Sequence, residues 1–95
     1  CMVALGTMSA PKPEQAHITE PLAISRLRTH AGFVRCVERG IATGELSEET
    51  DAQAMGTMFN SFLLGVSILA RDGVKIPVFN ASIIELMKLW DSHQK

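Results

Sequence analysis

The segment from residue 51 to residue 72 limits what this chain can fold into more than any other feature of its sequence. At about 100° per residue, the spacing of an α-helix, its apolar side chains cover a very wide arc. The positions on this arc are Ala52, Met55, Met58, Phe59, Phe62, Leu63, Val66, Leu69 and Ala70. The polar strip that remains consists of Gln53, Thr57, Asn60, Ser67 and Arg71. Such a helix must be covered on more than one side, which a single small domain can hardly do.

Two helices are predicted ahead of this segment. Residues 1–8 read as the end of a helix, and a proline-containing loop follows. The next helix is long and amphipathic, with three arginines opposite an apolar face of Ala23, Leu27, Val34, Val37 and Ile41. It ends near Thr43, where Gly44 supplies a left-handed cap. Its start stays open between residues 14 and 19, because Pro21 fits a first turn but kinks a helix interior.

Capping residues mark the ends of the apolar helix and the start of a last one. Thr50 and Gln53 match a capping box, in which the threonine hydroxyl caps a helix that begins near residue 51, and Gly73 provides the stop. Pro77 opens a final helix over roughly residues 77–91. Since no segment alternates like a strand bounded by hairpin turns, the sequence predicts an all-α fold, a bundle of about four helices.

The size and charge of the chain narrow its class. Its 95 residues allow one domain, and 46% of them are hydrophobic, which separates the chain from disordered proteins. A chain of this length builds a modest core, so a partner subunit is an expected source of further stability. The net charge of -1 lacks the basic excess that DNA phosphates demand, so these residues alone are not expected to bind nucleic acid tightly.

Cysteine content and hydropathy indicate the compartment. Cys1 and Cys36 are too few for a disulfide scaffold, and Cys36 lies in an apolar helical pattern where a buried, reduced thiol is typical. No apolar run approaches the ~18 to 20 residues that a membrane span needs, and no signal-peptide pattern is present. We therefore expect a cytoplasmic protein without a membrane partner.

The ionisable and nucleophilic residues form no constellation for catalysis. His17, His30 and His93 do not stand at the helical spacing that brings two metal ligands together. Neither cysteine has a base nearby in the sequence, and no pattern of a serine triad or a phosphate loop is present. We therefore expect no catalytic residues, no metal and no cofactor.

His30 differs from the other two histidines in its position. It falls at the centre of the apolar face between Leu27 and Val34. A neutral imidazole there must find a hydrogen-bond partner or titrate. Two interpretations stay open at this point: a core histidine with a satisfied ring, or a residue that faces a ligand.

The apolar helix contains methionines, phenylalanines and glycines that also allow two interpretations. The large side chains are Met55, Met58, Phe59 and Phe62. Such residues fill irregular cores, and they also line pockets for apolar ligands. Gly56 and Gly65 each cost about 1 kcal/mol relative to alanine within a helix, and close approach of another helix would compensate for that cost. Gly65 is therefore a candidate crossing point.

Three segments carry a family resemblance. They are Cys-Met-Val-Ala-Leu at 1–5, Cys-Val-Glu-Arg-Gly-Ile-Ala-Thr-Gly-Glu-Leu at 36–46, and Leu-Leu-Gly-Val-Ser-Ile-Leu-Ala-Arg-Asp-Gly at 63–73. In their order and spacing these segments resemble the C-terminal domain of TetR-type bacterial transcriptional regulators. The resemblance extends over nearly the whole chain.

The resemblance implies that DNA binding and effector sensing belong to two separate domains. A helix-turn-helix domain, absent from these 95 residues, reads an operator, while residues 1–95 form a domain that dimerises and senses a small effector. The last two helices of each copy then form a four-helix bundle across a two-fold axis. On this basis the expected dimer interface consists of Phe62, Gly65, Leu69, Ile83, Met87 and Trp90.

The effector site is predicted from helix faces alone. The residues we expect to contact an apolar effector are His30, Val34, Met55 and Phe59. Repression that is relieved by the effector is the commoner direction in the family. Two other functions stay open: a helical interaction module that binds a partner helix without sensing, and a small all-α enzyme.

Overall fold

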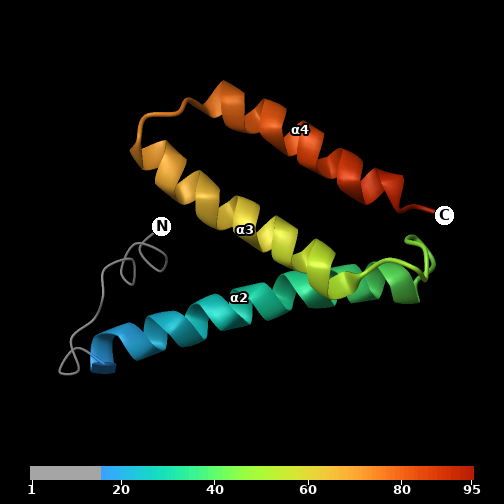
Figure 1. Cartoon of the computed structure of the whole chain (residues 1–95), viewed down its shortest axis with the longest axis horizontal. Coiled ribbons are helices and arrows are strands. Elements are labelled where there is room, and N and C mark those ends of the chain that lie inside the picture. Colours follow the sequence, from blue (N-terminus) through green and yellow to red (C-terminus); the bar gives the residue numbers. More distant parts are fainter. Residues whose placement is uncertain (1–15) are drawn as a thin grey trace.

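The described part of the chain is all-α, as the sequence predicts. The computed structural model describes residues 16–95, which form three helices, α2 (Ala16–Ala42), α3 (Ala52–Arg71) and α4 (Ile76–Ser92). The helix expected at residues 1–8 lies outside the described residues. Figure 1 shows α3 and α4 running antiparallel, with α2 crossing below α3. The shortest dimension is 14 Å, little more than the 10–12 Å width of one α-helix, so the helices form a single layer.

The structure decides where α2 begins. It starts at Ala16, so Pro21 lies inside the helix and not in its first turn. Proline has no N–H to donate, and the resulting loss of one helical hydrogen bond falls near the N-terminal end, far from the packed part of α2. The helix ends at Ala42, and Gly44 follows with the predicted left-handed backbone at φ 83°.

The start of α3 corrects the predicted capping box. Asp51, not Thr50, is the N-cap, and its Oδ1 accepts a hydrogen bond of 3.0 Å from the backbone N–H of Ala54. The carboxylate accepts a hydrogen bond from a backbone N–H that has no partner within the helix, and its negative charge is stabilised by the helix dipole. The helix therefore begins one residue later than it would with Thr50 as the N-cap. The hydroxyl of Thr50 is buried without a hydrogen-bond partner.

The other two helix boundaries agree with the sequence. Gly73 follows the C-cap of α3 in a left-handed conformation at φ 95°. Pro77 lies in the first turn of α4, where its missing N–H costs nothing. The connection between α3 and α4 is therefore short, and the two helices form a hairpin.

The core is small and lies at one end of the molecule. Its buried apolar side chains are Val34, Val37, Leu46 and Met55. Leu46 comes from the loop between α2 and α3 and is 0% exposed. Ile41, Ala52, Phe59, Leu89 and Trp90 pack around this core and are partly buried.

Backbone hydrogen bonds tie the end of α4 to this core. Ser47 N–H donates to the carbonyl of His93 over 2.8 Å, and Lys95 N–H donates to the carbonyl of Glu45 over 3.2 Å. The Trp90 indole N–H also donates to the Glu45 carboxylate, over 3.2 Å. We call this region, residues 40–51 with residues 89–95, the junction. It joins the C-terminal ends of α2 and α4 to the N-terminal end of α3.

Away from the junction the helices are unequally packed. Of the three described helices, α2 and α3 alone pack closely along their backbones. A Cβ atom on Gly56 would lie 2.7 Å from the Cα of Val34, so the absence of a side chain allows the two helices to cross. By contrast, no residue of α4 is buried.

Candidate functional site

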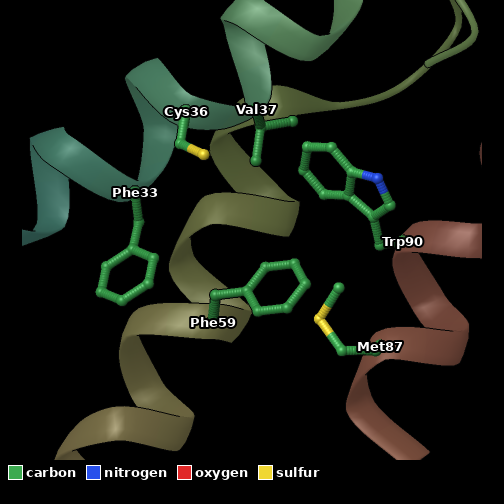
Figure 2. A pocket seen from close by; sticks show the side chains of 6 residues that line it. All are labelled: Phe33, Cys36, Val37, Phe59, Met87 and Trp90. Atoms are coloured by element: carbon green, nitrogen blue, oxygen red, sulfur yellow. The ribbon is translucent and has the colours of Figure 1, made fainter. Parts of the chain in front are cut away.

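A groove opens where α4 diverges from α2. Its volume is about 260 Å³, and it is open to solvent on one side. Figure 2 shows the side chains that line it, which come from all three helices: Phe33, Cys36, Val37, Phe59, Met87 and Trp90. We call it the apolar groove.

Helical spacing explains how the walls of the groove arise. Phe33, Cys36 and Val37 stand three and four residues apart on α2, so they share one face of that helix. Met87 and Trp90 are three apart on α4 and form the opposite wall. Phe59 of α3 forms the floor and meets the Trp90 ring edge to face, with ring centroids 6.4 Å apart and an interplanar angle of 67°.

The lining of the groove is uncharged. The Trp90 N–H is already bonded to Glu45, so the indole presents an apolar surface to the groove. The polar function that remains among the lining side chains is the thiol of Cys36, a weak donor. The predicted burial of this thiol is wrong, because Cys36 is free and exposed. Val37 takes the position against the core, and its neighbour Cys36 is rotated by about 100° onto the flank that α4 leaves open.

A second, more polar hollow lies on the other flank of α2. It has a volume of about 360 Å³ and is lined by Leu27, His30, Ala31, Val34, Arg35, Glu38 and Gln53. The His30 Nε2 lies 2.7 Å from the Thr57 hydroxyl, in a hydrogen bond that joins α2 to α3. The ring of His30 therefore has a partner and also borders a hollow, which we call the His30 hollow.

The four predicted ligand residues do not share one cavity. His30 and Val34 line the His30 hollow, and Phe59 lines the apolar groove. Met55 belongs to the buried core between them. Sequence reasoning placed none of Phe33, Cys36 and Val37 in a site. Their spacing along α2 indicates that they share one helix face. It does not show that this face lines a groove until the position of α4 is known.

The six predicted interface residues also divide into groups. Phe62, Gly65 and Leu69 line a small hollow of about 160 Å³ where α3 turns into α4. We call this region, residues 62–82, the open end. Ile83 and Met87 are exposed on α4, whereas Trp90 packs within its own chain at the junction. An added Cβ on Gly65 would meet nothing within 4 Å, so no other helix of residues 16–95 crosses there.

The helix α3 carries more uncovered apolar surface than the sequence reading allowed for. By length and composition, it is the one helix among residues 16–95 that could cross a membrane, contrary to the expectation that no stretch approaches this length. Its polar residues, such as Gln53, Thr57, the pair Asn60-Ser61 and Ser67, interrupt every apolar run without lowering the average hydropathy much. Met55 and Gly56 are its only buried residues.

Neither the ionisable residues nor comparison with known proteins assigns a function or a family to this chain. Among residues 16–95, no three His, Cys, Asp or Glu side chains lie together as a metal site would require. Comparison with known proteins found no matching family model, no matching curated protein and no matching solved structure. The function is therefore inferred from the residues and geometry of this chain.

Proposed function

We propose that this chain is the regulatory domain of a TetR-like transcriptional regulator, most simply a cytoplasmic repressor. In this function two copies associate through α3 and α4, and each copy binds a small, largely apolar effector. Operator reading falls to a helix-turn-helix domain outside these 95 residues, as the sequence resemblance implies.

The observation that carries the proposal is the uncovered apolar face of α4 and the open end of α3. Ile83, Ile84 and Met87 are exposed on α4, and Leu63 and Leu69 are exposed on α3. Large exposed apolar patches are rare on monomeric soluble proteins and mark interaction sites, and these exposed side chains on two helices of one hairpin support such a site here. A single layer of helices leaves both of its faces open, and a second hairpin of the same kind would cover one of them.

The hollows of the chain support the effector-binding part of the proposal. Ligand sites commonly occupy about 300–1,000 Å³; the His30 hollow, at about 360 Å³, stands at the small end of that range, and the apolar groove, at about 260 Å³, lies just below it. The presence of such hollows on both flanks of α2 favours sensing over an interaction module that merely binds a partner helix. His30 is hydrogen-bonded to Thr57 and not to another ionisable group, so no second ionisable side chain orients it as a general base. This arrangement gives no support to the enzyme alternative.

Effector control follows from linkage between binding and geometry. Half-sites read by helix-turn-helix dimers lie about 34–36 Å apart, so a regulator must hold its two DNA-binding domains at that distance. An effector that binds better to another arrangement of the dimer lowers the population that fits the operator. The shift cannot exceed the difference in its affinity for the two arrangements.

Sedimentation equilibrium of the 95-residue chain tests the dimer directly. We expect a dimer at micromolar concentration, and Ile83→Glu should convert it to a monomer, because a carboxylate would be buried in the interface. Ile24→Glu is the matched control, because Ile24 is 44% exposed and Ile83 is 45% exposed, but Ile24 lies on α2. A well-folded monomer in the unmodified chain, or equal effects of both substitutions, would overturn the proposal.

A further inference from the structure

We infer that the apolar groove, and not the His30 hollow, is the effector site, and that it takes uncharged planar aromatic molecules of one or two rings. This inference rests on the proposed function, because it names the site and the chemical class of the proposed effector. It replaces the residues expected from helix faces with a set that the structure brings together around one space.

The charge of the lining sets the charge of the occupant. None of the six side chains that line the groove is charged, and the Trp90 N–H is occupied by Glu45. A carboxylate or an ammonium ion placed there would lose hydration without gaining a partner. The groove is therefore complementary to a neutral molecule. The His30 hollow, which Arg35 and Glu38 border, offers charged partners and has no such preference.

The size of the groove limits the occupant to small molecules. An apolar cavity of about 150 Å³ holds one benzene ring, so about 260 Å³ accommodates one or two rings. A whole helix, which is about 10–12 Å wide, is too large for this space. On the side of Val37 and Trp90 the groove borders the core, because Val37 is a core residue and Trp90 packs against the core.

The chemistry of the walls favours an aromatic occupant over an aliphatic one. Phe33, Phe59 and Trp90 present ring faces and edges from three different helices. A planar ring can meet them in stacked and edge-to-face arrangements, as Phe59 and Trp90 already meet each other. The sulfur atoms of Cys36 and Met87 add polarisable contacts that favour aromatic rings.

A matched set of three probes tests the inference on the full chain. Naphthol is neutral and aromatic, naphthoate carries a charge on the same rings, and decalol is the saturated counterpart. The chain has one tryptophan, so the indole N–H signal in an NMR spectrum belongs to Trp90, whose ring lines the groove. We expect naphthol to shift this signal, with naphthoate binding at least about tenfold more weakly and decalol about threefold more weakly.

Two substitutions on α2 distinguish the two hollows. Cys36→Phe fills the apolar groove, and Ala31→Phe fills the His30 hollow on the other flank. Both positions are exposed on the same helix, so neither substitution should unfold the chain, and neither adds a tryptophan. Cys36→Phe should weaken naphthol binding about tenfold or more by steric exclusion, and Ala31→Phe should leave it unchanged.

Alkylation of Cys36 identifies the occupant by a second route. In a Cys1→Ser chain, iodoacetamide reports on Cys36 alone, and naphthol should slow the reaction. Slower alkylation at higher protein concentration without naphthol would mean that a second copy fills the groove, which overturns the inference. So would failure of naphthol to bind at millimolar concentration, or block of binding by Ala31→Phe instead of Cys36→Phe. If the chain is a dimer in these cases, the proposed dimerisation stands while the inferred site fails.

Discussion

The junction and the open end of the hairpin show opposite degrees of packing, although α3 and α4 take part in both. At the junction, Leu46 is fully buried, and backbone hydrogen bonds join the loop after α2 to the end of α4. At the open end, Leu69, Ile76 and Val78 are exposed. The buried contacts that stabilise the single chain are thus concentrated at one end of the hairpin. It leaves apolar surface exposed at the other end, where we propose that a second copy packs.

The cause of the difference lies in which segments reach each end. The junction receives a third element, α2, together with the loop that carries Leu46 into the core. Among residues 16–95, the open end receives only the turn between α3 and α4, whose residues Val74 and Val78 border a hollow without filling it. A two-helix hairpin cannot enclose its own apolar face, so within residues 16–95 the apolar surface of the open end stays uncovered.

Leucine truncation at the two ends should show the largest contrast. Leu46→Ala removes a fully buried side chain and should lower the free energy of unfolding by about 2–5 kcal/mol. Leu69→Ala, at the open end, should change the stability of the monomer by about 0.5 kcal/mol or less. Urea unfolding followed by circular dichroism, at a concentration where the chain is monomeric, measures both. Equal losses would mean that the open end is packed in the single chain.

Glycine substitution in α3 should give a smaller contrast, with opposite signs. Gly56→Ala places a Cβ 2.7 Å from the backbone of Val34 and should destabilise the chain by about 1–3 kcal/mol. Gly65→Ala meets nothing and should stabilise the monomer by up to about 1 kcal/mol through helix propensity.

The proposed dimer provides a second measurement for this pair of glycines. If a partner helix crosses α3 at Gly65, alanine there should weaken the dimer in sedimentation equilibrium while stabilising the monomer. An unchanged dimer dissociation constant would place the crossing elsewhere on the hairpin and would leave Gly56 as the one glycine of α3 with a packing role.

The features predicted correctly from the sequence are those set by local backbone chemistry. Gly44 and Gly73 adopt positive φ angles after helices, which other residues do at a cost, and Pro77 suits a first helical turn. These preferences act within a few residues and need no knowledge of the fold. The apolar periodicity of residues 51–72 likewise requires only the helix repeat, and the helix is there.

The features that could not be predicted depend on how α4 is placed. The apolar groove is lined from all three helices, and the hydrogen bond between Glu45 and Trp90, 45 residues apart in sequence, is one of the contacts that place α4 beside it. Nothing in the pattern of α2 alone says that Cys36 faces an open flank and not a packed one. Periodicity identifies faces of helices, and the pairing of faces is a long-range property.

The smallest expected effect concerns the N-cap of α3, which is Asp51 in the structure and Thr50 in the sequence prediction. Asp51→Ala should lower the free energy of unfolding by about 1 kcal/mol, because the Ala54 N–H loses its acceptor. Thr50→Val keeps the shape of the side chain and removes a buried hydroxyl that has no partner, so stability should stay equal or rise by up to about 1 kcal/mol. A threonine cap predicts the opposite order, with Thr50→Val the more costly change. Thermal unfolding of the two variants side by side therefore decides which residue caps the helix, since the sign of the difference between them is the result.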